Sequence, residues 1–436
     1  MAYQLGIREW SLLAQADGTR DLEGILAAAA RNGTFAAVAT FQTFLEALHA
    51  QGLLADGVEP LPEAPPTHPS RPLEPLPDFH LLCDGQGSCC RLYATVMFRP
   101  REEAVARGLL PQVLEAGDHP ERAFAPLSGS APCGASSVGF VDGRCVYLGR
   151  DGQCGLHAAG GSQGKPLGCR TFPALYVDDG QTIRVSPAVE CACVLASLGL
   201  GSKGEPLVAP GLTNSDELDP GIHLARLPEE IRITGKRYAS REDFVRWSRI
   251  VSTAPPPSDA LGVFVALAEV VETWGLDPRA TLQALATPGA VEPTSIRPAL
   301  LRLLERTRRR LQVDAAWRSD TDLALRAVRW IAKAAERLTL EPSLLERALF
   351  TPPSVTQARS EAFYLRAIVH GHQLVLEDAP LAPALRDRAV RLVLGRAFLF
   401  VVGPDELQEE PTLRHPLALV EATLRGHGLL SRDGLL

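Results

Sequence analysis

The residues of this chain that are best suited to chemistry are its nine cysteines, all of which lie between residues 79 and 197 of a 436-residue sequence. Thiolates gathered in one part of a chain typically bind a metal ion or an iron–sulfur cluster. An odd number of thiols in a chain without a secretion signal is poor material for disulfides. The clustering therefore predicts a metal centre.

The spacing of the cysteines favours an iron–sulfur cluster and leaves zinc as the alternative cofactor. The sequence has no C-x2-C pair, although such pairs are typical of zinc ribbons. Irregular spacing suits a cluster assembled from several loops. Cys133, in a loop rich in Ser, Gly, Ala and Pro, is expected to pack rather than to bind. The expected metal ligands are the other eight cysteines: Cys83, Cys89, Cys90, Cys145, Cys154, Cys169, Cys191 and Cys193.

The first three cysteines lie within a glycine-rich loop. Glycines let a backbone fold tightly around an ion and direct its N–H groups at sulfur. The adjacent side chains of Cys89 and Cys90 diverge in extended chain, so one is expected to bind while the other packs or serves a second centre. His157, three residues after Cys154, could complete a mixed site. A lone histidine such as His157 or His80 is more often a hydrogen-bonded surface or core group.

The motifs C-x5-C-C-R, C-x8-C and C-R-T-F-P resemble those of the CxxCxxxCC cysteine-cluster (YkgJ-type) family of zinc- or iron-chelating proteins, and within it the flagellin lysine N-methylases. The resemblance covers residues 83–197. One departure is Gln86, which stands where the family has a cysteine, so that Cys133 or Cys193 would have to replace that ligand. The matching positions are Cys83, Cys89, Cys90, Cys145, Cys154, Cys169, Arg170, Phe172, Pro173 and Cys191 or Cys193.

This resemblance implies a protein-modifying enzyme, an S-adenosylmethionine-dependent lysine N-methyltransferase. Arg170, Asp151 and Asp178 would then orient the substrate or take a proton. Residues 199–204 match G-x-G-x-x-G, but they follow a predicted helix rather than a strand and are expected to form a linker. No Rossmann site for S-adenosylmethionine is therefore recognisable. The alternative function is a non-catalytic metal-binding or partner-docking protein that serves a peptide-modification pathway.

Four segments are expected to position these residues: a winged-helix-like unit at 1–57, a proline-rich linker at 58–78, the cysteine-cluster metal-binding domain at 79–200 and a helical domain at 201–436. Eight prolines in the eighteen residues from Pro60 to Pro77 exclude a helix or a central strand. Apolar residues recur at helical spacing in 242–251, 259–274, 297–311, 322–338, 360–376 and 382–400. The predicted fold class is mainly α, with an irregular cysteine-rich core.

The N-terminal unit resembles the small domain of the pyrroloquinoline-quinone peptide chaperone. The resemblance lies in a W-x-L-L, D-G-T, F-L-x-x-L and G-L-L rhythm over about fifty residues. Thr19 is expected to cap a first helix, and Val38, Phe41, Leu45 and Leu48 are expected to share one buried face of a second. This unit could have either of two roles: a structural or partner-docking role, or the recognition of a peptide.

Composition limits the classes of partner. The net charge of −7 provides no basic field for nucleic acid or anionic lipid. The N-terminus has no secretory signal, and the most apolar windows are shorter than the roughly 20 residues that span a bilayer. We therefore expect a cytoplasmic protein whose partner or substrate is a protein or peptide, without nucleic acid or membrane.

Overall fold

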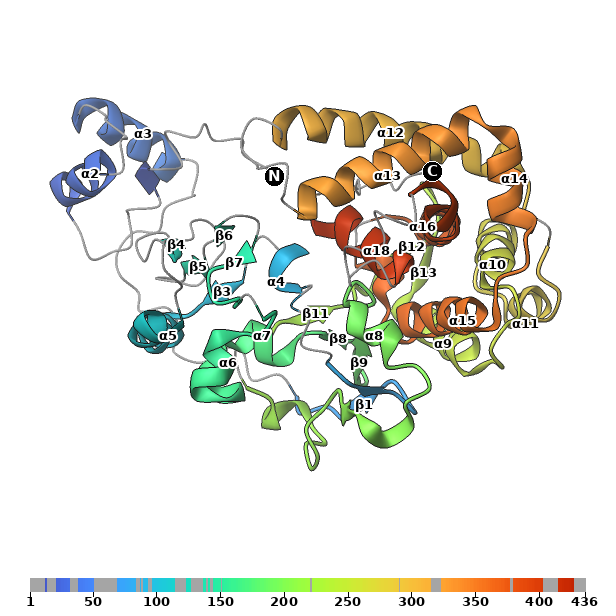
Figure 1. Cartoon of the computed structure of the whole chain (residues 1–436), viewed down its shortest axis with the longest axis horizontal. Helices are drawn as coiled ribbons and strands as arrows, with labels where there is room; N and C mark the ends of the chain where they lie inside the picture. The colour runs from blue at the N-terminus through green and yellow to red at the C-terminus, as the bar shows by residue number, and fades with distance from the viewer. Residues whose placement is uncertain are drawn as a thin grey trace.

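A computed structural model describes residues 12–13, 21–31, 38–50, 69–83, 87, 89–92, 96–113, 123–126, 136–138, 140–141, 144–149, 151–219, 222–289, 291–314, 323–376, 379–402 and 415–426. The predicted mainly α class is confirmed. Long helices fill one side of the molecule, and short strands and helices with the cysteines fill the other (Figure 1). No helix in these ranges is long and apolar enough to cross a membrane.

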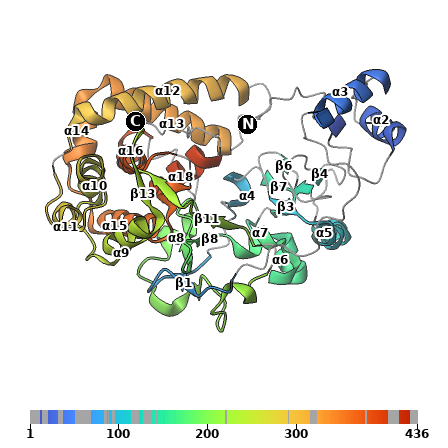
Figure 2. The same cartoon turned by 180° about the vertical axis from the view of Figure 1, so that it is seen from behind.

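The helices of the C-terminal half, here called the helical domain (residues 241–426), enclose the largest hydrophobic core. Its central helix, α10, is buried on every side over residues 260–268, as expected for a helix segment surrounded by others. It packs against α16, and α12 packs along α13, as Figure 2 shows from behind. The helices are α9 (Arg241–Thr253), α10 (Ala260–Trp274), α11 (Pro278–Ala286), α12 (Pro293–Asp314), α13 (Leu323–Leu340), α14 (Pro342–Phe350), α15 (Val355–His370), α16 (Leu381–Val401) and α18 (Pro416–Gly426).

Each of the six helices predicted in this half is present, with shifted ends. The largest shift is in α15, which begins five residues before the predicted Ser360 and ends at His370. Its start is set by Ser354, whose side chain accepts a hydrogen bond from the Gln357 N–H. Helices α11 and α14 were not predicted; both are nine residues long and begin at a proline in the first turn.

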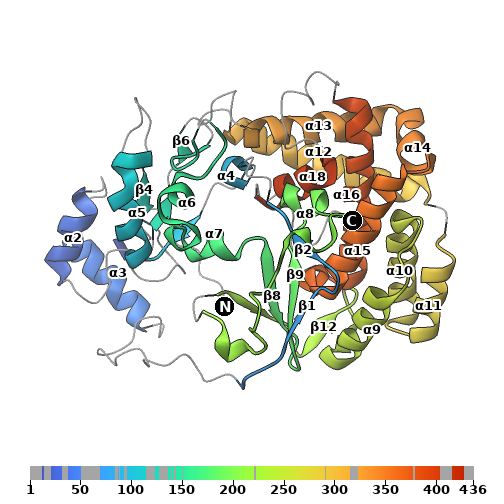
Figure 3. The same ribbon diagram turned by 60° about the horizontal axis from the view of Figure 1, so that its bottom comes forward.

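A four-stranded sheet lies between the cysteine-rich side and the helical domain (Figure 3). Its order is β1 (Leu73–Pro75), β9 (Ile183–Pro187), β8 (Ala174–Asp178) and β11 (Leu224–Arg226). Strands β8 and β9 form an antiparallel hairpin, and both edge strands run parallel to their neighbours. The end of the proline-rich segment thus forms an edge strand, a position where proline's missing N–H costs little. Helix α15 packs against β9.

The elements from α4 to α7, here called the cysteine unit (residues 89–171), share a second, small core. The rings of Phe98, Phe124 and Tyr147 meet at its centre, with centroids 5.0 to 6.4 Å apart. A three-stranded sheet covers this core in the order β3, β5, β4. The elements are α4 (Cys89–Leu92), β3 (Met97–Phe98), α5 (Pro100–Val113), β4 (Phe124–Pro126), β5 (Ser136–Val138), β6 (Phe140–Val141), β7 (Arg144–Cys145), α6 (Gly155–Gly160), η2 (Ser162–Gly164) and α7 (Leu167–Thr171).

Short elements connect the two sides. Helix α8 follows the β8–β9 hairpin, and its Val194 and Leu195 belong to the core of the helical domain. The remaining elements are β2 (His80–Leu81), α8 (Ala192–Ala196), η3 (Gly201–Lys203), β10 (Glu205–Pro206), η4 (Ser215–Glu217), β12 (Glu230–Arg232), β13 (Tyr238–Ser240) and η5 (Gln373–Val375).

Near the N-terminus, helices α2 (Leu22–Arg31) and α3 (Val38–Ala50) pack on each other. Phe41 and Leu48 are buried, as the helical spacing predicts, and Leu45 is partly buried. The cap of α2 is Asp21 rather than the predicted Thr19, since the Asp21 carboxylate accepts a hydrogen bond from the Gly24 N–H at 2.8 Å. The rest of the predicted winged-helix-like unit, like most of the linker, lies outside the described residues.

Candidate metal centre

A tight turn brings Cys145 and Cys154 together. Leu148 and Cys154 pair as an isolated β-bridge, and the Gly155 N–H donates to the Tyr147 carbonyl at 2.7 Å. The Asp151 carboxylate closes the turn by accepting from the Gln153 N–H at 2.9 Å. Cys145 therefore ends strand β7, and Cys154 precedes the first turn of α6.

The loop that carries Cys89 and Cys90 packs directly on this turn. Gly87 has a φ of +66°, and a Cβ built there would lie 2.5 Å from Leu148 Cδ1 and 3.0 Å from the Gly152 carbonyl oxygen. Only glycine accommodates both the conformation and the close approach. The Gly87 carbonyl then accepts from the Cys90 N–H at 2.9 Å, so the contact is continuous with the start of α4.

A half-buried carboxylate contacts the helix that carries Cys169. Glu102 on α5 accepts a hydrogen bond from the Leu167 N–H at 2.8 Å, at the first residue of α7. The same carboxylate accepts from the Arg99 N–H at 3.0 Å and pairs with Arg170 at 3.7 Å. Glu102 thus joins α5 to α7 and holds Cys169 beside the turn.

The four thiols of Cys89, Cys145, Cys154 and Cys169 lie close enough for their charges to interact. Burial raises the pKa of Cys145 to about 12, and negative charge on Cys169, Cys154 or Cys89 raises it further. Burial also raises the pKa of Cys169 to about 12, with contributions from Cys89 and Cys154. The pKa of Cys89 is raised well above its ordinary value by the hydrogen bond with Cys90 and by burial.

Other groups act against this rise in pKa. The Tyr147 N–H lowers the pKa of Cys145, and the Cys90 N–H lowers the pKa of Cys89. Backbone N–H groups act in the same way on thiolates that bind metals, because they offset part of the sulfur's negative charge. The ammonium group of Lys165 acts in the same direction on Cys169. This donor set fits a thiophilic cation.

Within the described ranges, no three His, Cys, Asp or Glu side chains are as close together as the ligands of one ion. Cys89 Sγ and Cys90 Sγ are 4.0 Å apart, a spacing that two thiolates on one ion can have, but no third ligand among the described residues joins them. The four thiols whose charges interact therefore do not form a complete ligand group among the described residues.

Two other predicted ligands, Cys191 and Cys193, are buried in the core of the helical domain, at the start of α8. Cys90 packs against the core of the cysteine unit, as Cys154 does, and its thiol lies 4.0 Å from that of Cys89. Cys83 is exposed, although its charge raises the pKa of Cys89. Cys133 lies outside the described residues. The histidines also separate, because His157 is exposed on α6 and His80 is on β2.

The three residues that the family resemblance offers for catalysis all have structural partners. Arg170 donates to Gln163 Oε1 at 2.7 Å and pairs with Glu102. Asp151 closes the turn described above. Asp178 is buried at the end of β8, where it forms an ion pair with Arg71 and accepts from the Gly180 N–H at 2.9 Å. These contacts explain why the side chains are placed as they are without any substrate.

Sequence reasoning missed Glu102 and the contact of Gly87 with Leu148. Glu102 lies in the first turn of a helix in a segment with no cysteine, where acidic residues commonly complement the helix dipole. Its link to residue 167 depends on tertiary structure. Gly87 could have been found, because a glycine flanked by cysteines in a short loop indicates a position with positive φ.

Comparison with known proteins gives no further guide, since no protein-family model, no curated protein and no solved structure matches this chain. The resemblance to the cysteine-cluster family, and the methyltransferase activity that it implies, therefore stay predictions.

Proposed function

We propose that this chain is a metal-binding protein whose centre is held by Cys89, Cys145, Cys154 and Cys169. The observation that supports it is the convergence of four thiols from four separate elements on one small region. The raised pKa values of Cys89, Cys145 and Cys169 mean that their thiolate forms are unstable there without a compensating positive charge. A thiophilic cation supplies that charge and takes the place of the protons.

Among cofactors, an iron–sulfur cluster is preferred and zinc is the alternative. Four thiolates suit either one. When bound, the cluster or ion would supply cross-links between α4, β7, α6 and α7. The chain's own contribution is to hold the thiols on these short elements and to bury Cys145 in the core of the unit.

Anaerobic purification of the full chain tests the proposal. We expect bound iron with acid-labile sulfide and a visible absorption band, or else stoichiometric zinc without colour. Cys145→Ser and Cys169→Ser should each lose most of the bound metal, because a serine oxygen is a poor replacement for a thiolate. Cys133→Ser is the matched control and should keep it. A Cys145→Ser protein with full metal content would refute the ligand assignment.

Cys191→Ser separates this ligand set from the wider one predicted from sequence. Since Cys191 belongs to the core of the helical domain, we expect the variant to keep the metal of the cysteine unit. Loss of half of the metal in this variant would instead indicate a second centre. Loss of all of it would place Cys191 in the same centre as Cys145.

The role that we propose for the centre is structural, in a protein that docks a peptide or protein partner. The structural partners of Arg170, Asp151 and Asp178 favour this role over lysine N-methylation. Calorimetry with S-adenosylmethionine and the metal-loaded protein distinguishes the two. Binding of S-adenosylmethionine, followed by methyl transfer to a lysine peptide, would contradict the structural role and support the lysine N-methyltransferase activity.

A further inference from the structure

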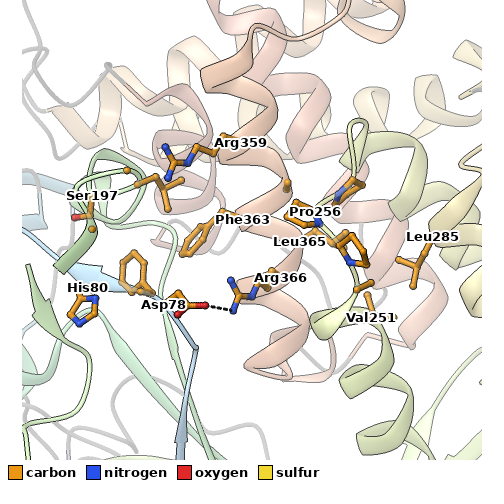
Figure 4. Close-up of a pocket in the computed structure, with 18 residues that line it drawn as sticks. Asp78, His80, Ser197, Val251, Pro256, Leu285, Arg359, Phe363, Leu365 and Arg366 are labelled. Carbon is orange, nitrogen blue, oxygen red and sulfur yellow. Dashed lines mark ion pairs between the residues drawn. The ribbon is translucent and has the colours of Figure 1, made fainter.

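A cavity of about 430 Å³ lies outside the cysteine unit, between α15 and the segments that precede β2 and follow α8 (Figure 4). This volume is within the range of small-molecule sites in proteins, which is about 300 to 1,000 Å³. Most of its wall is apolar. Val251 and Leu285 come from α9 and α11, and the three consecutive prolines 255–257 also line it.

One face of α15 supplies the cavity's charges and an aromatic ring. Arg359, Phe363 and Arg366 are spaced i, i+4 and i+7, which places them in line along the helix. The ring of Phe363 packs on Phe79 with centroids 5.1 Å apart, so it presents a fixed aromatic surface. The wall therefore combines a rigid ring with two guanidinium groups.

The two arginines differ in their partners. Arg366 pairs with Asp78 at 4.0 Å and donates to the Pro77 carbonyl at 3.0 Å. Arg359 has no ion-pair or hydrogen-bond partner among the residues that the structure describes. A cation without an anion at an otherwise apolar cavity is a recognition element for carboxylate or phosphate groups, which guanidinium binds in a planar, two-pronged geometry.

The chain also has a glycine that makes room for this arginine. Gly199 has a φ of +93°, and a Cβ built there would lie 2.5 Å from Arg359 Nη1. The guanidinium therefore lies against backbone that only glycine allows at that position. Gly199 belongs to the G-x-G-x-x-G match, which is not a dinucleotide site but forms part of this cavity wall.

We propose that the cavity binds a small amphipathic anion, in which a carboxylate or phosphate faces Arg359 and a planar apolar body lies against the ring of Phe363 (Figure 4). The site is separate from the metal centre and does not depend on the metal-binding function. Its ligand is recognised by one charge and one flat surface, which matches the free cation and the fixed ring of the wall.

Three probes with the same ring test the proposal by isothermal titration calorimetry on the full chain: 1-naphthylacetate, 1-naphthyl phosphate and the uncharged 1-naphthylacetamide. We expect the better anion to bind about tenfold more tightly than the amide, as a charge-assisted hydrogen bond predicts. The preference should shrink as salt is raised. The anion that binds more tightly identifies the anionic group of the natural ligand.

Variants assign the binding to this cavity. Arg359→Gln should reduce the affinity for both anions to that for the amide, and Phe363→Leu should weaken all three probes. Arg309→Gln is the control, because it removes an exposed arginine of α12 that pairs with Glu305. Equal affinities for all three probes, or an Arg359→Gln protein that still prefers the anions, would overturn the proposal.

A gain of affinity provides a test that misfolding cannot imitate. Asp78→Asn removes the anion that neutralises Arg366, and Asp78 is exposed with a φ of +58°, which asparagine tolerates well. An Arg366 guanidinium without the opposing charge of Asp78 should raise the affinity for 1-naphthylacetate about threefold, as a partly exposed charge contact predicts, and leave the amide unchanged. An unchanged or lowered affinity for the anion would count against the assignment of the charges.

Discussion

The cysteine unit and the helical domain differ in the interactions available to stabilise them. The helical domain buries side chains from nine helices in one continuous core, and α10 and α16 contribute on nearly all sides. The cysteine unit has strands of two or three residues and a core formed mainly by three aromatic rings. A core of that size rarely stabilises a fold by itself, so small units of this kind use metals or disulfides as cross-links.

The two regions also differ in the partners of their buried polar groups. In the helical domain, the buried carboxylate of Glu421 accepts from Arg388 and Arg391, each at 2.7 Å, and from the hydroxyl of Tyr364. The charges there satisfy one another. In the cysteine unit, burial raises the pKa of the Cys145 and Cys169 thiols, which have no such network of opposite charges. The helical domain therefore carries its own counter-charges, whereas under our proposal a bound cation would supply the counter-charge in the cysteine unit.

Metal removal should have the largest effect and should affect only one of the two regions. Chelation of the metal is expected to unfold the cysteine unit, because binding energy of about 10 kcal/mol or more contributes to the folding of small thiolate sites. Reaction of the thiols with Ellman's reagent reports on that unit. The fluorescence of Trp247, Trp274 and Trp330, all in the helical domain, should stay near that of the loaded protein.

Simultaneous loss of the tryptophan signal on chelation would mean that the two regions fold as one. The proposal that the metal stabilises the cysteine unit and the hydrophobic core stabilises the helical domain independently would then be wrong. Addition of the metal back to the chelated protein provides the control, since it should restore the protection of the thiols.

The second largest effect is expected from Glu421→Gln in the helical domain. The change removes a charge that two buried arginines share, and an uncompensated buried charge costs about 3–5 kcal/mol of unfolding free energy. Urea denaturation followed by tryptophan fluorescence measures it. Glu305→Gln, which removes an exposed pair with Arg309, is the control and should cost less than about 1 kcal/mol. Equal costs for the two variants would refute a buried network.

Sequence reasoning predicted six helices of the C-terminal half, but not how the parts of the molecule join, and the metal centre stays a prediction. Periodicity located α10 and α16 because they bury whole faces. It missed the strands of the cysteine unit, which are too short to show alternation. The clustering of cysteines indicated a metal centre, yet the separation of Cys191 from Cys145 depends on α8 entering the other core. The cavity was not predicted, because its wall combines segments from residue 78 to residue 366.

Gly87→Ala should destabilise the cysteine unit while the helical domain is unaffected. A non-glycine residue at φ +66° costs about 1–2 kcal/mol, and the contact with Leu148 adds about 1–3 kcal/mol. The expected results are lower metal content and faster reaction of the thiols at unchanged tryptophan fluorescence. Gly108→Ala is the matched control, since a Cβ on that residue of α5 meets nothing within 4 Å. It should be neutral or slightly stabilising. Equal thiol reactivity in the two variants would contradict the role of the loop.

The smallest effect concerns the joint between the sheet and the helical domain, where His370 is buried and its Nε2 lies 3.0 Å from the Glu74 carbonyl oxygen. Burial lowers the pKa of His370 to about 4, and the positive charges of Arg184, Arg366 and any protonated His372 lower it as well. In the unfolded chain the imidazole titrates near 6.5. Below that pH the unfolded state takes up a proton that the folded state excludes, so stability falls as the solution is acidified.

Between pH 7.5 and 5.0 the loss attributable to His370 should be about 2 kcal/mol, since one pKa unit corresponds to about 1.4 kcal/mol. His372, whose pKa burial also lowers, adds to it in the same direction. His370→Gln keeps a donor for the Glu74 carbonyl and removes the titration, so its unfolding free energy should depend less on pH by that amount. His157→Gln, at an exposed position of α6, should retain the full dependence. If His370→Gln retains it too, then the sheet separates from α15 before the helical domain unfolds, and the two regions are joined less tightly than their contacts indicate.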